Sequence, residues 1–228
     1  MQFLVVKGEV THYPRAMQMT PVDDNPDTHD LSPEDFSLWA KKNRFFRAMA
    51  AAVARAGYGE TAVADILREA GMSRRTFYEL FEDREDCFLQ AFDAALERVR
   101  ALVGAAYHEA GEWVDLRGRV ELGLGAFLGC CASEPELARM CIVEVLAAGQ
   151  RARERRDAAV LEFASFIEHP RAEARGAAAP SLVSEAIAGG IYGIVYARIA
   201  RGETATLPGL LAELMDSGLG QLVDGGDG

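Results

Sequence analysis

The amino-acid sequence predicts an all-α protein in which a small N-terminal headpiece of three helices is joined to a larger helical domain. Ala and Leu are abundant, and alternating runs of β-branched residues are scarce after the first ten positions, so helical propensity dominates. Half of the 228 residues are hydrophobic, which is enough for a buried core in one or two domains. Between Gly57 and Glu85, caps and turn residues alternate at short intervals, which indicates short helices in succession.

Three segments are expected along the chain. Residues 1–33 hold four prolines and a cluster of Asp and Asn, so we expect an extended or disordered tail. Met17 or Met19 is a candidate for the true start. Residues 34–85 should form the headpiece, and residues 86–228 the larger helical domain.

The first helix of the headpiece is expected to start near Ser32, or to restart near Lys41, and to run to Ala56. Its apolar residues recur at helical spacing and form one stripe: Phe45, Phe46, Met49, Ala50 and Val53. Gly57 tolerates a positive φ and should end this helix.

The second and third helices are short, and each begins at a predicted cap. Thr61 is expected to cap the second helix and Ser73 the third, because a side-chain hydroxyl accepts a hydrogen bond from an unpaired amide at a helix start. Gly71 lies in the turn between them. Phe77 should anchor the third helix, which leaves Arg74 and its neighbours facing outward.

The remaining chain is predicted to be helical. A long amphipathic helix should run from Glu82 towards Tyr107 and end at Gly111. Further apolar periodicity predicts helices over Leu116 to Cys131, Glu134 to Ala148, Arg151 to Glu168, Ser181 to Arg201 and Leu207 to Val223. The segment from His169 to Pro180 is expected to be a loop.

The distribution of charge matters because the net charge of −11 argues against a nucleic-acid partner. Residues 41–85 carry nine Lys or Arg against seven acids, whereas the segments before and after them are net negative. The only net-positive section is therefore the headpiece, which gives modest support for an anionic partner.

A helix-turn-helix binds DNA by placing its second helix in the major groove, where the first residues of that helix meet base edges. Here that helix begins SRRTFY. Two successive arginines suit guanine or phosphate oxygens, and hydroxyl groups suit phosphates. The alternative is that three short helices simply pack into a larger bundle, with Arg74 and Arg75 on a solvated face.

Several motifs within residues 41–90 carry a resemblance to a known family. They are GY at 57–58, TAVADI at 61–66, AGMS at 70–73, TFY at 76–78, and Phe81 followed by DRE at 83–85. Together they resemble the N-terminal signature of TetR/AcrR-family transcriptional regulators. The resemblance implies an all-α fold, with this helix-turn-helix headpiece on a divergent domain for ligand binding and dimerisation.

The resemblance also implies which residues contact DNA. Arg75 stands where the family often has Gly, and Arg84 replaces the usual Lys. Hydroxyl residues would bind phosphates, the paired arginines would reach bases or nearby backbone, and Arg84 would contact phosphate. The full expected set is Thr61, Ser73, Arg74, Arg75, Thr76, Tyr78 and Arg84.

A homodimer is expected because two headpieces about one DNA turn, ~34 Å, apart read a pseudo-palindrome. The segment AIAGGIYGIVYARIAR at 186–201 mixes glycines with apolar and aromatic residues, so another helix can approach closely. In TetR-like regulators the last two helices pair with those of a second subunit. The expected interface is Gly189, Gly193, Tyr196, Leu207, Leu211 and Leu214, and the alternative is an ordinary intramolecular core.

A ligand pocket is expected between the fourth helix and its successors, as the resemblance implies. We expect an apolar small-molecule effector, aromatic or acyl in character. Any single candidate is more often plain core than pocket wall. The candidates are Trp113, Phe127, Cys131, Met140, Val143, Phe163, Tyr192 and Tyr196.

The four cysteines lie in apolar helical patterns and contain no CxxC spacing, which favours reduced core thiols. Cys130, Cys131 and Cys141 leave a thiol sensor or a soft-metal site open as a less favoured alternative. We predict no resident metal and no cofactor.

Catalysis is not expected. The four histidines are scattered, and no HExxH, GxSxG or phosphate-binding glycine loop is found. The longest N-terminal apolar run, Phe3 to Val6, is too short for a signal peptide or a membrane span, so a cytoplasmic protein without a membrane partner is expected.

The sequence predicts a ligand-responsive transcriptional regulator, a repressor released from double-stranded operator DNA by its effector. The alternative is a helical small-molecule-binding or protein-interaction module that does not use its headpiece on DNA.

Overall fold

The computed structural model describes residues 3–6, 9–12, 32–110, 116–175 and 181–216. A short antiparallel hairpin of β1 (Phe3–Val6) and β2 (Glu9–His12) comes first, with Phe3 opposite His12. All other regular elements in these ranges are helical, which confirms the all-α fold class.

The headpiece consists of α1 (Pro33–Ala56), α2 (Val63–Ala70) and α3 (Arg74–Leu80). Helix α1 is continuous from its cap: Ser32 Oγ accepts the amide of Asp35 at 3.2 Å, and Pro33 occupies the first turn, where its missing N–H costs nothing. Gly57 ends α1 with φ 81°, and Gly71 closes α2 in the left-handed region with φ 61°. Both glycine terminations were predicted from the sequence.

The core of the headpiece is aromatic. Phe45 from α1 meets Phe77 from α3 edge-on, with ring centroids 5.4 Å apart, and meets Phe81 at 5.6 Å. This cluster continues without interruption into the C-terminal part of the chain, because Met140 and Val145 are fully buried against it. The headpiece therefore shares one hydrophobic core with residues more than 50 positions further along the chain.

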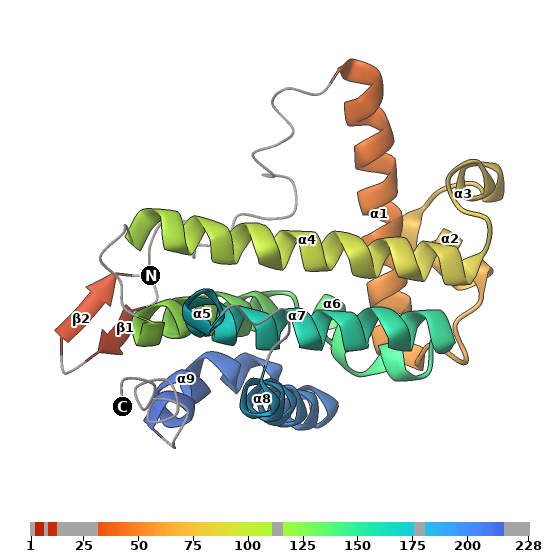
Figure 1. Cartoon of the computed structure of the whole chain (residues 1–228). Helices are drawn as coiled ribbons and strands as arrows, with labels where there is room; N and C mark the ends of the chain where they lie inside the picture. Colours follow the sequence, from red (N-terminus) through yellow and green to blue (C-terminus); the bar gives the residue numbers. More distant parts are fainter. Residues whose placement is uncertain (1–2, 7–8, 13–31, 111–115, 176–180, 217–228) are drawn as a thin grey trace.

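The larger domain is arranged in layers below the long helix α4 (Arg84–Ala110), as Figure 1 shows. Helix α5 (Leu116–Ser133) packs on α4, and α7 (Gln150–Arg175) packs on α8 (Leu182–Ala200). The short helix α6 (Pro135–Ile142) and the 3-10 turn η3 (Glu144–Leu146) connect α5 to α7, and α6 packs against α1.

The chain that follows α8 returns to α5. The 3-10 segment η4 (Thr204–Gly209) and the short helix α9 (Leu210–Leu214) pack on α5, and a second buried cluster lies there. Its members come from α5, α6, α8 and the η4–α9 segment, and include Val120, Leu124, Leu128, Ala138, Ile191, Val195, Ile199, Leu207 and Leu211.

Some predicted boundaries were wrong. Helix α7 extends to Arg175, through seven residues predicted to be loop, because the segment is rich in Ala, Arg and Glu, which favour helix. The helix expected over 134–148 is divided at Val143, whose φ of −100° leads into the 3-10 turn η3. The helix expected over 207–223 is represented by η4 and α9, and its part beyond residue 216 lies outside the described residues.

Candidate functional site

The second helix of the predicted helix-turn-helix, α3, presents its polar side outward. Ser73 caps it as predicted: its Oγ accepts the amide of Thr76 at 3.1 Å and lies 2.9 Å from the Thr76 hydroxyl. Phe77 is fully buried, so α3 is fixed to α1 from below. Arg74 and Arg75 are exposed at the start of the helix.

Arg75 has one internal partner. Its Nε donates to Glu79 one turn later, over 2.8 Å, and this carboxylate raises the pKa of the guanidinium further above its usual range. The arginine side chain nevertheless remains 88% exposed. A surface ion pair of this kind is weak because water screens both charges, so it leaves the guanidinium available to an external partner.

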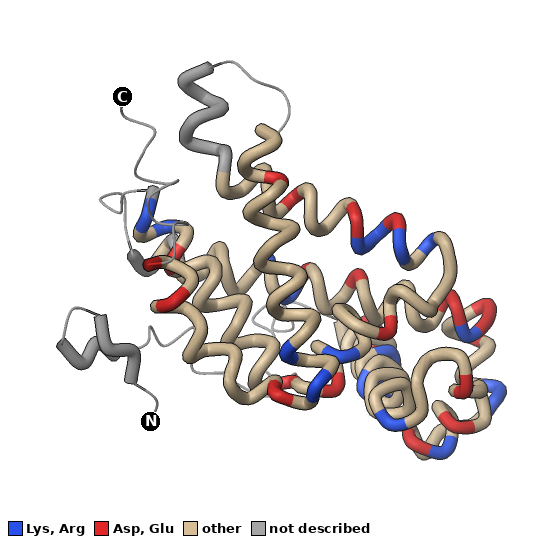
Figure 2. The backbone as a smooth tube through the Cα atoms, turned by 90° about the horizontal axis from the view of Figure 1, so that it is seen from below, with Lys and Arg blue, Asp and Glu red and all other residues tan. Residues whose placement is uncertain are grey.

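Tyr78 is half exposed, and its ring packs edge-on against Phe77 with centroids 5.4 Å apart. The phenol is therefore held at the surface of α3 by its packing against the buried Phe77. Figure 2 shows Lys and Arg interleaved with Asp and Glu over the end of the molecule that carries the headpiece, rather than a broad basic face.

Two predicted DNA-binding residues are used inside the protein. The structure contradicts Thr61 as the cap of α2, because Ala62 occupies that position and its amide is bound by Asp65. Thr61 is buried, and its hydroxyl donates to the carbonyl of Gly57 at 2.7 Å.

Arg84 turns back towards the same segment. Its Nη1 donates to the carbonyl oxygens of Tyr58, at 3.1 Å, and of Thr61. Its guanidinium lies 4.2 Å above the Tyr58 ring. Arg84 therefore holds the α1–α2 turn against the start of α4, a structural role that the sequence motif alone did not reveal.

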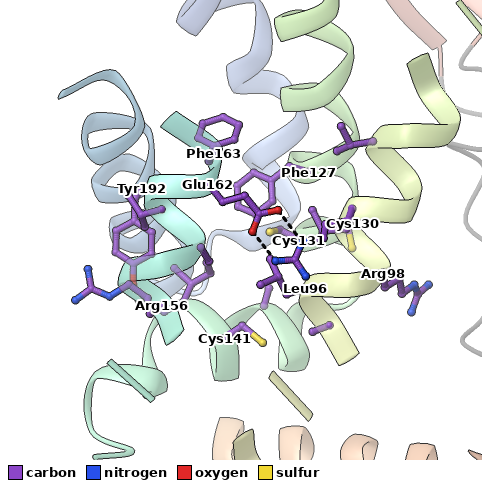
Figure 3. A pocket seen from close by; sticks show the side chains of 18 of the residues that line it. Leu96, Arg98, Phe127, Cys130, Cys131, Cys141, Arg156, Glu162, Phe163 and Tyr192 are labelled. Carbon is purple, nitrogen blue, oxygen red and sulfur yellow. Dashed lines mark hydrogen bonds and ion pairs between the residues drawn. The ribbon is translucent and has the colours of Figure 1, made fainter. Parts of the chain in front are cut away.

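A cavity of about 420 Å³ lies beneath α4, between α4, α5, α6, α7 and α8. Figure 3 shows its aromatic wall formed by Phe127 and Phe163, whose ring centroids are 6.4 Å apart. Four of the predicted pocket residues line it: Phe127, Cys131, Phe163 and Tyr192.

Other predicted pocket residues lie elsewhere. Met140 is fully buried in the cluster shared with the headpiece, and Val143 packs against the second cluster. Neither they nor Tyr196 are among the residues that line the cavity. Trp113 lies outside the described residues.

The residues predicted to line the pocket included none from α4, although α4 forms one wall of the cavity. Phe92, Leu96, Val99 and Val103 line the cavity at helical spacing, so the apolar stripe of α4 was the available signal. Arg100 on α4 bridges to α7, where its Nε donates to Glu162 at 2.7 Å and lowers the pKa of that carboxyl. Figure 3 shows Glu162, with its contacts dashed, beside the two phenylalanines of the aromatic wall.

Tyr192 links α8 to α6. Its hydroxyl donates to the carbonyl of Ile142 at 2.7 Å, and burial raises its pKa to about 12, so it remains a donor at neutral pH. The guanidinium of Arg156 lies 5.2 Å from its ring centroid.

Three thiols face the cavity, namely Cys130, Cys131 and Cys141, and all are free. Burial raises the pKa of Cys130 to about 11 and the pKa of the other two well above the usual value. Among the described residues, no group of three His, Cys, Asp or Glu is placed to hold a metal ion. Thiolate chemistry is therefore disfavoured at neutral pH.

This protonation predicts slow alkylation of the cavity thiols. A thiolate is the reactive form, and an unfolded cysteine has a pKa of about 8.5. At pH 8 the native protein should react with iodoacetamide at least about tenfold more slowly at these positions than the urea-unfolded protein. Rates measured by peptide mass spectrometry that were equal in both states would contradict a buried, protonated thiol cluster.

Helix α8 has an uncovered side. A Cβ atom added at Gly189, Gly190 or Gly193 would meet nothing within 4 Å, and Ile194 is 40% exposed beside them. By length and mean hydropathy α8 is also the one helix, within the ranges described, that would suffice to cross a membrane, and only 28% of it is buried in the subunit.

Part of the predicted dimer interface lies inside the subunit. Leu207 and Leu211 are buried in the second cluster, where the Leu211 side chain lies 3.2 Å from the position of a Cβ on Gly125. Leu214 packs partly against the same cluster. Leu207 and Leu211 therefore pack within their own chain.

Comparisons agree with this geometry. The sequence profile of the bacterial regulatory proteins of the tetR family matches residues 47–91, the segment from mid-α1 to α4. No curated protein sequence matches the chain.

Solved structures share the fold. FadR from Bacillus subtilis in complex with stearoyl-CoA superposes with a TM-score of 0.63 at 16% identity, over 80% of this chain and 97% of that one. FadR from Bacillus halodurans gives a TM-score of 0.62 at 16% identity, over 82% and 96%. A TetR-like transcriptional regulator from Rhodococcus sp. RHA1 gives 0.55 at 19% identity, over 79% and 96%.

The fold is all-α, with a helix-turn-helix headpiece joined to a larger helical domain that encloses an apolar cavity. The match over residues 47–91 is to the tetR family of bacterial regulatory proteins, the family that the headpiece motifs resemble.

Proposed function

We propose that this protein is a homodimeric repressor that binds a pseudo-palindromic DNA operator and is released by an apolar effector. The observation that carries this proposal is the pairing of two sites in one chain. Helix α3 exposes two successive arginines, and a separate apolar cavity lies under the helix that follows it.

The proposed DNA contacts are those of α3. Arg74 and Arg75 would meet base edges or nearby phosphates, and Ser73, Thr76 and Tyr78 would bind phosphates. Thr61 and Arg84 are left out because their polar groups already bind carbonyl groups within the headpiece. The functional division proposed is a tail over 1–33, a DNA-binding headpiece over 34–85, and an effector and dimerisation domain over 86–228.

The uncovered side of α8 supports a homodimer. Its glycines permit close approach of a second helix, and exposed apolar groups such as Ile194 gain from being covered. A second copy is the natural occupant, because two headpieces are needed to read a pseudo-palindrome. Gly189, Gly193 and the half-buried Tyr196 remain the proposed contacts.

The effector is proposed to be apolar, with an acyl chain as the first class to test. The cavity wall is formed mainly by aliphatic and aromatic side chains. Its three arginines, Arg98, Arg100 and Arg156, are ion-paired with Glu134, Glu162 and Asp157. The fold is shared with a FadR that is bound to stearoyl-CoA, which supports an acyl ligand. Release requires that the effector bind the DNA-competent and DNA-incompetent spacings with different affinities.

Selection of binding sites from a random DNA pool, at controlled salt, tests the proposal. An enriched pseudo-palindrome with half-sites about one helical turn apart is the expected result. No enrichment at low salt would leave an effector-binding or protein-interaction module whose headpiece does not act on DNA.

Replacing Arg75 with alanine should relax base preference and weaken operator binding by about 1–3 kcal/mol, because a bidentate base contact is lost. Tyr78→Phe is the matched variant on the same helix, and it should weaken operator and random DNA alike. Fluorescence anisotropy with both DNAs separates the two effects. Equal losses on both DNAs for Arg75→Ala would mean that Arg75 contacts only phosphate.

A further inference from the structure

One carboxylate of the larger domain holds the backbone of the headpiece. Glu144, in η3, accepts the amide of Tyr58 at 3.0 Å, across 86 positions of sequence. Its other oxygen lies 3.4 Å from Nη2 of Arg139, and only 12% of the Glu144 side chain is exposed. A carboxylate so withdrawn from water is costly unless its partners remain in place.

The α1–α2 turn packs closely against the Glu144 carboxylate. Gly57 has φ 81°, and a Cβ at that position would lie 3.4 Å from Oε2 of Glu144. Tyr58 also meets Phe88 edge-on at 5.1 Å and lies beneath Arg84. The α1–α2 turn is therefore held from two sides: by α4 through Arg84, and by η3 through Glu144.

The last residues of α6, just before η3, line the cavity. Cys141 and Ile142 line the cavity, and the Ile142 carbonyl accepts the hydroxyl of Tyr192, another lining residue, at 2.7 Å. Figure 3 shows Tyr192 and Cys141 among the residues around the cavity, and Figure 1 shows α6 passing beside α1. Glu144 follows Ile142 by only two residues, so a shift of this wall displaces the carboxylate.

We propose that Glu144 is the positioning residue through which the occupancy of the cavity changes the orientation of the headpiece. This inference rests on the proposed function, since it concerns the coupling between effector and operator. Coupling is reciprocal, so operator binding must in turn alter the η3 turn and the adjoining cavity wall. The coupling is therefore measurable without knowing the effector.

The test is amide hydrogen exchange of the full-length protein, free and bound to its selected operator. In Glu144→Ala the Tyr58 amide should exchange about tenfold faster or more, the equivalent of one lost hydrogen bond to a charged group. In Glu144→Gln an amide oxygen still accepts that bond, so protection should stay within about threefold of the original chain. Glu136→Ala, which removes an exposed acid of α6, is the matched control and should change neither.

The operator complex gives the decisive readout. Operator binding should slow exchange at residues 141–146 by about threefold or more in the original chain, in Glu144→Gln and in Glu136→Ala. That response should be absent in Glu144→Ala, whose fold is checked by its circular dichroism. A full response in Glu144→Ala would overturn the role of Glu144 alone, whereas the absence of any operator complex in the original chain would overturn the proposed function and the inference with it.

Discussion

Replacing Phe77 with alanine is expected to lower the free energy of unfolding by about 3–5 kcal/mol, the usual cost of deleting a fully buried aromatic side chain. The side chain has no exposed surface and touches the rings of Phe45 and Phe81, with centroids 5.4 and 5.2 Å away. Its removal leaves a cavity at the centre of the cluster that fixes α3. Urea denaturation followed by circular dichroism measures the loss.

Two further variants test whether the loss of stability comes from the buried ring of Phe77. Phe77→Leu keeps most of the buried volume and should cost less than about 1.5 kcal/mol with repacking. Glu79→Ala, on the exposed side of the same helix, should change stability by no more than about 0.5–1 kcal/mol, since it breaks only a surface ion pair. A Phe77→Ala protein as stable as Glu79→Ala would show that the headpiece core does not depend on this ring.

The second large effect is expected at α8. Ile194→Glu would bury a carboxylate at the proposed subunit interface, at a cost of several kcal/mol per ion. In a symmetric dimer the substitution is present on both subunits, so two carboxylates are buried. The variant should be monomeric at micromolar concentration and should bind the full operator about 100-fold more weakly, because one headpiece then binds alone. Sedimentation velocity and operator titration measure the two losses.

Leu38→Glu is the control for this substitution. Leu38 is 44% exposed on α1, close to the 40% of Ile194, but lies far from α8 (Figure 1). The control should keep the mass of the original protein. An Ile194→Glu protein that sediments as a dimer would move the subunit interface away from this side of α8.

The sequence predicted features that depend on neighbours within one or two turns. The caps Ser32 and Ser73, the glycine terminations of α1 and α2 and the burial of Phe77 all follow from local amide pairing, backbone freedom or helical spacing. Thr61 was misassigned as a cap because α2 is capped one residue later, at Ala62, and the Thr61 hydroxyl binds the Gly57 carbonyl instead. The role of Arg84 was missed because it depends on carbonyl groups of the α1–α2 turn. That turn lies 23 and 26 residues before Arg84.

The larger domain was less predictable for a related reason. An apolar stripe indicates that a helix is covered, but it does not say by what. Leu207 and Leu211 have the spacing of an interface and are covered by their own α5, whereas Met140 has the character of a pocket wall and packs under the headpiece. Only the tertiary arrangement separates these cases.

The shared core of headpiece and effector domain has a consequence for protein engineering. Residues 34–85 are the proposed DNA-binding headpiece, but Met140, Val145, Ala148 and Ala152 complete their hydrophobic cluster. In a chimaera that exchanges only the first 85 residues with another regulator, the new headpiece would pack poorly against these four residues. Transplanting the DNA specificity of this protein should therefore require the α6–α7 junction as well, or the exchange of α3 surface residues alone.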